Sequence, residues 1–545
     1  MNVLILGAGL MQKPAILSAK ELSYKVNVID ADKNAVSIPY AHYFRQIDLK
    51  DKEKILEFAR ELQSDGGLKA VFTAGTDFSS SVSYVCEKLG LKAHSYQASI
   101  NASVKTQMRE CFKKEKVPSP AFVKVTPSDV NENLLAKVLE QMSFPLVVKP
   151  VDNMGARGCR MVREEKEFLK AVKTAIECSR SASAIVEEYM EGPEYSIDAL
   201  VYNNTFTVTG FALRHIKYPP YFIETGHTMP AVLDKKTHDE LISVFALGAK
   251  ALGLTAGAAK ADIKYTKNGP MIGEIAGRLS GGYMSGWTYP YSSDLNLTKQ
   301  GLLIACGEEP EELILRRNKV DYQPGPLCRK AEKPYELFEV PSKRTSAERA
   351  WLSIPGTVEY VENINEYTDK AVFDVLPRAT VSLGCKVDFP RNNVEKCGNI
   401  ISVSNSEKIA VSSAQDAVSN VFITLKANNP ATDDFLNRKT LEDEEDFPPD
   451  AYGTLSSEDF SKIQGQIAEN QKVSDCIPSV ILENEKLNKV DWNYNTISDT
   501  ARKFDILRPH HKCLDANKFW RAVLRGGIQA AVYINDSTEV LCDKK

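Results

Sequence analysis

Short apolar segments alternate with helical patterns over roughly the first 90 residues, and this alternation limits the possible folds more than any other feature. The segments 3–6, 26–29 and 70–73 have the length of strands and are rich in β-branched residues. Apolar residues at helical spacing lie between and after them, for example over 55–62. Because strands that alternate with helices form parallel sheets, the sequence predicts an α/β domain over residues 1–94.

The turn after the first predicted strand departs from the dinucleotide-binding fingerprint at one position. It reads Gly7-Ala8-Gly9-Leu10-Met11-Gln12, and Asp30 ends the second strand. The third glycine of the fingerprint lets the helix approach the strand and the pyrophosphate, and Gln12 at that position prevents this approach. We therefore expect a Rossmann-like domain that does not bind NAD.

Composition indicates a soluble globular protein of several domains. The chain has 545 residues, which at about 100–200 residues per domain predicts three or four domains. Hydrophobic residues make up 43% and charged residues 26%, which excludes disorder by composition. The net charge of −4 gives no support to a nucleic-acid partner that is bound through phosphate neutralisation.

Cysteines and apolar runs predict a cytoplasmic location without a membrane partner. The eleven cysteines include no CxxC pair, which argues for reduced thiols rather than a disulfide framework or a zinc ribbon. The N-terminus has no basic segment and continues directly into the first strand and a glycine turn, unlike a signal peptide. The longest apolar stretch, 242–259, is interrupted by Lys250, so we expect a core helix there and not a membrane span.

A set of residues suited to nucleotide phosphates begins after residue 95. Lys105 lies on an amphipathic helix, and Lys149 ends an apolar strand at 144–150. The loop Asp152–Gly158 follows, where Gly155 and Gly158 free the backbone so that its N–H groups can point at phosphate oxygens. Arg157 in this loop is available for the γ-phosphate. Each piece alone is common on protein surfaces, and their order carries the prediction.

Two further segments supply contacts for the nucleoside. Glu187, Glu188, Tyr189 and Met190 follow a buried strand, where a carboxylate and the next backbone amides can contact the adenine edge. Glu194 comes four residues later and is placed to accept hydrogen bonds from ribose hydroxyls. Of the two neighbouring glutamates, Glu187 is the better candidate, because a charged residue at a strand end usually faces solvent.

A predicted hairpin supplies two carboxylates for a metal ion. Asp262 lies in one strand, the turn 267–270 reverses the chain, and Glu274 ends the next strand. Antiparallel pairing can place both side chains on one face. Mg²⁺ binds one or two carboxylates together with phosphates, so the hairpin suits this ion. Without the upstream lysines, we would expect two ordinary surface acids instead.

In this order and spacing the chain resembles the ATP-grasp superfamily, which has a biotin carboxylase-type grasp domain and includes the L-amino-acid (dipeptide) ligases. The resemblance implies an α/β and α+β multidomain protein that uses ATP and Mg²⁺ or Mn²⁺. It also implies that Arg278 holds a carboxylate or acyl phosphate. The sequence departs from the family pattern at Ala276, where such enzymes usually have an asparagine metal ligand. The implied domains are a Rossmann-like pre-ATP-grasp domain (1–94), a two-lobed ATP-grasp domain (95–328), a small β-rich C-terminal domain (329–430), an acidic linker (431–450) and a C-terminal extension (451–545).

The resemblance further implies catalysis by Lys149, Arg157 and Arg278 in an ATP-dependent carboxylate–amine ligase that forms an acyl phosphate and releases ADP and phosphate. The substrates are expected to be amino-acid-like small molecules, and a homodimer is the candidate assembly. Two alternatives remain open, a carboxylase-type or purine-pathway grasp enzyme and a non-catalytic ATP-binding scaffold protein. The candidate substrate contacts are Glu224, His227, Ser280, Gly281 and Gly282.

The C-terminal part of the sequence predicts structure without a function. Residues 414–425 are predicted to form a helix that closes the small β-rich domain. Residues 441–450 indicate an exposed acidic linker, and 519–527 a helix that stops at two glycines. His510 and His511 have no nearby cysteine or acid at ligand spacing, so we expect an exposed pair.

Overall fold

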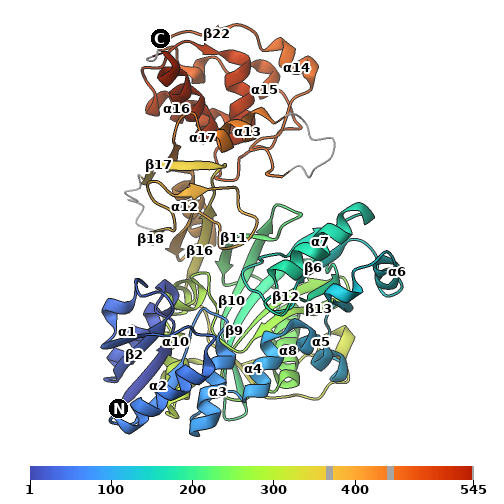
Figure 1. Cartoon of the computed structure of the whole chain (residues 1–545), viewed down its shortest axis with the longest axis vertical. Helices are drawn as coiled ribbons and strands as arrows, with labels where there is room; N and C mark the ends of the chain where they lie inside the picture. The colour runs from blue at the N-terminus through green and yellow to red at the C-terminus, as the bar shows by residue number, and fades with distance from the viewer. Residues whose placement is uncertain (364–371, 439–446, 543–545) are drawn as a thin grey trace. The chain divides into compact units, whose positions relative to one another are not determined.

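The computed structural model describes residues 1–363, 372–438 and 447–542, which divide into two compact units. Figure 1 shows the elements of each. The chain passes between the units within β11 (Ile223–Met229) and β16 (Thr345–Trp351). Unit 1 comprises residues 1–222, 227–347 and 405–407, and unit 2 comprises 223–226, 348–404 and 408–545.

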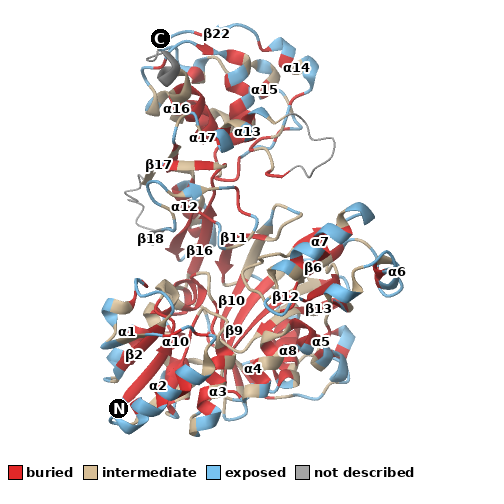
Figure 2. Ribbon diagram, viewed as in Figure 1, coloured by how far each residue is buried: buried red, intermediate tan, exposed pale blue. Residues whose placement is uncertain are grey.

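The predicted N-terminal α/β domain is confirmed. Its four strands pair in parallel in the order β3-β2-β1-β4. Ile55 and Phe58 of α2 pack on one face of this sheet, while Ala15 and Ile16 of α1 pack on the other. Strands β1, β2 and β4 are largely buried, the edge strand β3 is partly exposed, and the helices expose their outer faces (Figure 2). The elements are β1 (Asn2–Leu6), α1 (Lys13–Glu21), β2 (Lys25–Asp30), β3 (Tyr43–Gln46), α2 (Lys52–Ser64), β4 (Leu68–Phe72) and α3 (Ser79–Leu89).

A small antiparallel sheet follows, in the order β5-β8-β6-β7. α7 packs on this sheet through Phe168, Ala171, Val172 and Ala175, which recur at the three- and four-residue spacing of one helix face. The elements up to this sheet are α4 (Tyr96–Ser103), α5 (Lys105–Lys114), β5 (Phe122–Val125), α6 (Leu134–Leu139), β6 (Leu146–Pro150), β7 (Arg160–Val162), α7 (Glu165–Cys178) and β8 (Ala184–Glu188).

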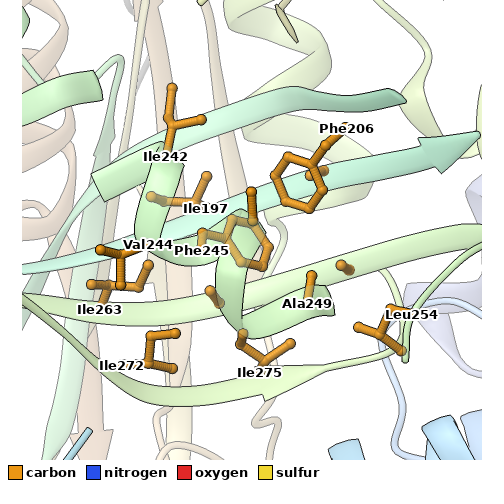
Figure 3. Packing of buried hydrophobic residues seen from close by; sticks show 14 of the residues in the cluster. Ile197, Phe206, Ile242, Val244, Phe245, Ala249, Leu254, Ile263, Ile272 and Ile275 are labelled. Carbon is orange, nitrogen blue, oxygen red and sulfur yellow. The ribbon is translucent and has the colours of Figure 1, made fainter. Parts of the chain in front are cut away.

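A larger sheet of unit 1 is apolar on one face, while its other face carries the polar residues of the hairpin together with apolar residues that pack against the N-terminal domain. Its strands include the antiparallel series β13-β12-β9-β10. Figure 3 shows Ile263, Ile272 and Ile275 of the apolar face against Phe245 of α8. α8 approaches so closely that a Cβ on Gly248 would lie 2.4 Å from Cδ1 of Ile272. The elements are β9 (Glu194–Tyr202), β10 (Thr205–Lys217), α8 (Lys235–Leu252), β12 (Gly257–Thr266), β13 (Gly269–Ala276), α9 (Tyr289–Ser293), α10 (Leu297–Cys306), α11 (Glu311–Arg316), β14 (Asn318–Lys319) and β15 (Glu336–Glu339).

Unit 2 combines short strands with a helical C-terminal part. β17 pairs with β19 and β21, β18 pairs with β20, and α17 packs against α13 and α16. The elements are β17 (Gly356–Asn363), β18 (Val372–Ala379), β19 (Lys386–Val387), β20 (Gly398–Ser404), α12 (Glu407–Ser419), β21 (Val421–Leu425), α13 (Pro430–Asn437), α14 (Ser457–Lys462), β22 (Gln466–Ile467), α15 (Ser479–Leu482), α16 (Ile497–Leu507), β23 (Leu514–Asp515) and α17 (Ala516–Cys542).

Of three local predictions for unit 2, two are wrong and one is confirmed. The helix expected over 414–425 ends at Ser419, because the β-branched and aromatic residues after it form strand β21. The predicted glycine stop is confirmed, because Gly527 has a non-helical backbone with a φ of +59°, and a second helical segment follows it within α17. His511 is buried, since its ring packs beside Phe504 and both of its nitrogens bond backbone carbonyls.

The predicted acidic linker is described only at its ends, because residues 439–446 lie outside the described residues. Residues 430–437 form helix α13, and Phe447 is buried beside Phe389. The cysteines whose side chains are described are all free thiols. In the described parts of the chain, no helix combines the length and apolar character needed to cross a bilayer.

Candidate active site

The two predicted metal carboxylates face each other across the β12–β13 hairpin. Asp262 is the direct cross-strand partner of Glu274, so both side chains lie on the polar face of the sheet. Arg214 Nη1 lies 3.0 Å from Oδ2 of Asp262, and Lys260 Nζ contacts the same oxygen. Lys105 Nζ lies 3.2 Å from Oε1 of Glu274. Two carboxylates and three cations therefore meet at this hairpin.

The two carboxylates fit a magnesium or manganese ion. Burial raises the pKa of Asp262, but Arg214 and Lys260 outweigh it and keep that pKa below its usual range. For Glu274 the cations, Lys105 first, likewise outweigh burial and hold the pKa well below its usual range. Oδ1 of Asp262 is buried and accepts no hydrogen bond from any described residue, which leaves it available as a ligand.

No group of three or more His, Cys, Asp or Glu side chains suited to a metal lies within the described ranges. An all-protein metal cage is therefore not present in the part of the chain that the structure describes. Two carboxylates that are completed by substrate phosphates are the usual protein contribution to Mg²⁺ binding at a nucleotide site.

Glu187 is the centre of a buried group of three charges. Its side chain is only 4% exposed, Lys149 Nζ lies 2.7 Å from Oε2, and Arg109 Nε donates to Oε1 at 2.8 Å. Burial raises the pKa of Glu187, but Arg109 and Lys149 outweigh it and keep the pKa below its usual range. Arg109 also donates to the carbonyl of Gly273 at 2.6 Å, beside the register shift in the hairpin. This triad links α5, β6, β8 and β13.

The predicted glycine loop has backbone conformations with positive φ angles. Gly155, Ala156 and Gly158 have φ angles of +67°, +61° and +69°. A Cβ on Gly158 would lie 2.7 Å from Cβ of Cys178, so both conformation and space require glycine there. Lys105 Nζ donates to the carbonyl of Asn153 at 3.0 Å, which joins the loop to the cations. Arg157 is partly exposed in this loop.

The predicted nucleoside contacts lie at the next strand ends. Arg214 Nη1 lies 2.5 Å from Oε1 of Glu194, at the start of β9. Lys264 Nζ lies 3.8 Å from the other oxygen of Glu194 and donates to the carbonyl of Met190 at 3.0 Å. The same ammonium lies 4.6 Å from the ring centroid of Tyr189. Glu194, Tyr189 and Met190 are therefore held together by one lysine.

Arg278 and the turn after it are held from two directions. Arg278 Nε donates to Oδ1 of Asp77 at 2.7 Å, which anchors the guanidinium on the N-terminal domain. Asp198 is fully buried, and its Oδ2 accepts from the backbone N–H of Ser280 at 3.0 Å and from its hydroxyl at 2.8 Å. Burial raises the pKa of Asp198 to about 6. Gly281 approaches Gly75 so closely that a Cβ on Gly281 would lie 3.3 Å from the Gly75 carbonyl oxygen.

Two candidate substrate residues, Glu224 and His227, belong to strand β11. Glu224 belongs to unit 2, where Lys396 Nζ lies 3.5 Å from its carboxylate and both side chains are buried. His227 belongs to unit 1 and is completely buried in β11.

Sequence reasoning missed several charged residues that the fold brings to these candidates. Lys260 and Lys264 alternate with Asp262 along β12, and this period of two is a signal that places all three on one face. Arg109 lies one helical turn after Lys105, so its position beside the cations was readable from helix geometry. The remaining missed residues are Asp77, Asp198 and Arg214.

Comparison with known proteins gives relatives of moderate similarity. The chain is 26% identical over 296 residues to alanine–anticapsin ligase of Bacillus subtilis (strain 168), which covers 50% of this chain and 61% of that protein. It is 23% identical over 368 residues to carnosine synthase 1 of Homo sapiens, which covers 63% of this chain and 44% of that protein. The chain thus spans less than two thirds of the length of these curated relatives.

The fold and one domain model agree with these relatives. The structure of an L-amino acid ligase from Bacillus licheniformis is similar with a TM-score of 0.63 and 19% identity, over 78% of this chain and 98% of that chain. Residues 142–286 match the model of the ATP-grasp domain. This range includes Lys149, the glycine loop, both hairpin carboxylates and Arg278. The chain therefore carries an ATP-grasp domain.

Proposed function

We propose that the chain is an ATP-dependent carboxylate–amine ligase that acts on amino-acid-like substrates. The observation that carries the proposal is the hairpin of β12 and β13, where Asp262 and Glu274 face each other beside Lys105 and the glycine loop. The matched ATP-grasp domain and the similarity to alanine–anticapsin ligase and carnosine synthase support it.

The phosphates of ATP are assigned to the cationic end of unit 1. Lys105 and Lys149 contact the α- and β-phosphates, and the backbone of Gly155 to Gly158 covers them. Arg157 is assigned to the γ-phosphate. Asp262 and Glu274 hold Mg²⁺ or Mn²⁺, and the ion when bound neutralises charge between the reacting anions. Lys105 contacts Glu274 and the carbonyl of Asn153 in the loop, which supports the grouping of the cation, the loop and the metal carboxylate.

The nucleoside is assigned to the strand ends nearby. Glu194 accepts from the ribose hydroxyls, and the adenine lies against the backbone of Glu188 to Met190 with Tyr189 beside it. Both oxygens of Glu187 already bind Lys149 and Arg109. We therefore assign Glu187 to the positioning of Lys149 and not to the adenine.

The reaction has two transfers. A carboxylate oxygen of the first substrate attacks the γ-phosphorus, the bond from that phosphorus to the bridging β-phosphate oxygen breaks, and ADP leaves. The amine of the second substrate then attacks the acyl carbon, phosphate leaves, and the amine nitrogen loses a proton. Arg278 holds the carboxylate and stabilises the oxyanion that forms at the acyl carbon. Its ion pair with Asp77 orients the guanidinium for this contact.

The acyl substrate is assigned to the turn after Arg278. Ser280, Gly281 and Gly282 offer backbone groups there, and Asp198 fixes the turn through two hydrogen bonds to Ser280. Substrate contacts for Glu224 and His227 stay predictions.

A product screen tests the proposal. The purified chain is incubated with ATP, Mg²⁺ and pooled amino acids, with and without bicarbonate, while ADP release is recorded and products are identified by mass spectrometry. We expect ADP release that depends on two amino-acid-like substrates, together with a product lighter by one water than their sum. Turnover that requires bicarbonate and ignores amino acids would favour the carboxylase alternative. ATP binding without phosphate release for any carboxylate would favour the non-catalytic alternative.

A further inference from the structure

Position 276 is where this chain lacks an oxygen ligand, and the residue across from it is a lysine. Ala276 of β13 is the direct cross-strand partner of Lys260 of β12, two residues along the ladder from the Asp262–Glu274 pair. Side chains of direct partners lie on the same face, about 4.5–5.5 Å apart at Cβ. The methyl group of alanine cannot bind a metal, and the charged residue directly across the ladder from this position is Lys260.

Lys260 is held in this place by acids on two sides. Its side chain is 11% exposed, and its ammonium contacts Oδ2 of Asp262. On the neighbouring strand β9 its direct partner is Asp198, which is fully buried. A buried lysine needs such partners, and here they fix the charge on the polar face of the hairpin.

The positively charged side chains around the two carboxylates limit the number of divalent ions that can bind there. Three cationic side chains, Lys105, Arg214 and Lys260, bind the two carboxylates Asp262 and Glu274. Oδ2 of Asp262 is occupied by Arg214 and Lys260, which leaves Oδ1 as its open oxygen. A second divalent ion near position 276 would find no oxygen from Ala276 and would be repelled by the ammonium of Lys260.

We propose that the ammonium of Lys260 takes the place of a second divalent cation, so that this chain binds its nucleotide with a single Mg²⁺ or Mn²⁺. The inference rests on the proposed ATP site. It concerns the number of ions that the site accepts, a property distinct from the ability to bind nucleotide. In this view Lys260 and Ala276 act as a matched pair: the lysine supplies positive charge where the alanine supplies no ligand.

Counting bound Mn²⁺ tests the inference without turnover. Wild-type protein is mixed with a non-hydrolysable ATP analogue, AMPPNP, and Mn²⁺, and free Mn²⁺ is measured by electron paramagnetic resonance while bound nucleotide is measured in parallel. We expect one bound Mn²⁺ for each bound AMPPNP. The single variant A276N should also bind one, because the ammonium still repels a second ion.

The double variant K260M/A276N should bind two Mn²⁺ for each AMPPNP, a twofold rise, because it replaces the ammonium by a neutral chain and restores an amide ligand. The matched control is K69M, which removes a partly buried lysine outside the proposed site, where it pairs with Glu308, and should leave the number of ions at one. Unfolding temperatures establish that each variant is folded, and the wild-type count alone decides the inference if the double variant does not fold.

Two Mn²⁺ of similar affinity on the wild type, or one on a folded double variant, would overturn the inference and leave the proposed function standing. Failure of AMPPNP to bind at all would overturn the proposed function and this inference with it.

Discussion

Arg278 binds Asp77, which lies 201 positions earlier in the chain, through two guanidinium nitrogens: Nε at 2.7 Å and Nη2 at 2.6 Å from Oδ1. Asp77 lies in the loop after β4, and the backbone N–H of Gly75 in that loop donates to the carbonyl of Leu279 at 3.2 Å. The N-terminal α/β domain therefore sets the orientation of the arginine that is assigned to the carboxylate substrate.

The variant Asp77→Asn tests this orientation. It keeps the size of the side chain but removes its charge, so Arg278 loses its ion pair. Under the proposed function we expect the KM for the carboxylate substrate to rise about tenfold, which corresponds to about 1.4 kcal/mol, with a smaller change in kcat. The KM for ATP should stay within about twofold. Asp65→Asn is the control, since Asp65 is 80% exposed in its ion pair with Lys25. Equal KM values in Asp77→Asn and wild type would refute the role.

Glu274→Gln tests the metal carboxylates. The change removes one anionic oxygen ligand and keeps the volume, so we expect ADP release to fall at least about 100-fold, with a higher Mg²⁺ requirement for the remainder. The unfolding temperature should change little, because the side chain of Glu274 is 39% exposed. Glu336→Gln is a matched control: Glu336 is 50% exposed and its carboxylate lies 2.7 Å from Lys333. Full turnover by Glu274→Gln would contradict the assignment of Glu274 as a metal ligand.

Glu187→Gln separates a positioning role from an adenine contact. The variant leaves Lys149 and Arg109 buried without their anion, so we expect a loss of stability of about 3–5 kcal/mol and weaker binding of both ATP and GTP. If Glu187 positions Lys149, the preference for ATP over GTP stays as in the wild type. A change in that preference, measured by calorimetry with the two nucleotides, would instead indicate that Glu187 contacts the base.

His94 should make the stability of unit 1 depend on pH. Its Nδ1 accepts from the backbone N–H groups of Thr255 and Ala256, and its Nε2 bonds the carbonyl of Ala258 at 2.9 Å. Burial lowers the pKa of this imidazole from 6.5 to about 4, so the unfolded chain takes up the proton first. The contribution of His94 to the free energy of unfolding is therefore fully present above pH 6.5. It decreases by about 3 kcal/mol as the pH drops toward 4.

Unfolding in urea between pH 7.5 and 4.5 measures this effect. The variant His94→Gln should be less stable at neutral pH but should lose less of its stability on acidification than the wild type. The difference between the two proteins isolates His94 from carboxylates that titrate in the same range, such as Asp198. His510→Gln is the control, because His510 is exposed. Parallel pH curves for wild type and His94→Gln would rule the effect out.

Gly158→Ala tests the close packing of the glycine loop. The φ angle of +69° disfavours alanine, and the new Cβ would lie 2.7 Å from Cβ of Cys178. Gly90→Ala is a control with nearly the same backbone cost, since Gly90 has a φ of +68° and no neighbouring atom within 4 Å. We expect Gly90→Ala to cost about 1 kcal/mol and Gly158→Ala at least about twice as much. Chemical denaturation compares them, and equal losses would show that the contact with Cys178 relaxes freely.

Much of unit 1 was predictable because local patterns determine it. Residues 1–94 alternate strand and helix over short distances, and each apolar face finds a partner in the next element along the chain. The hairpin around the turn 267–270 was predictable for the same reason. The turn alone would pair Asp262 with Gly273, and it is the register shift beside Asp262 that makes Glu274 its partner on the same face. The lysine at the end of β6 and the glycine loop after it follow from positions in one short segment.

The partners of these residues were not predictable, because they come from distant segments. Glu187 looked free to contact a base, yet folding buries it between Arg109, 78 positions earlier, and Lys149. The ion pair of Glu224 with Lys396, 172 positions later, likewise joins distant segments of unit 2. Burial makes an unpaired charge costly, so each buried acid takes the cation that the topology brings near, and no local pattern specifies which cation that is.

Residue spacing alone thus predicted the α/β domain, the carboxylate hairpin and the order of the nucleotide-binding segments, since backbone periodicity and turn chemistry act over a few residues. Only the tertiary structure shows that the sheet register pairs Lys260 with Ala276 and that packing brings Asp77 to Arg278. These pairings depend on desolvation and on contacts between segments far apart in the chain, and both arise only when the whole unit is packed.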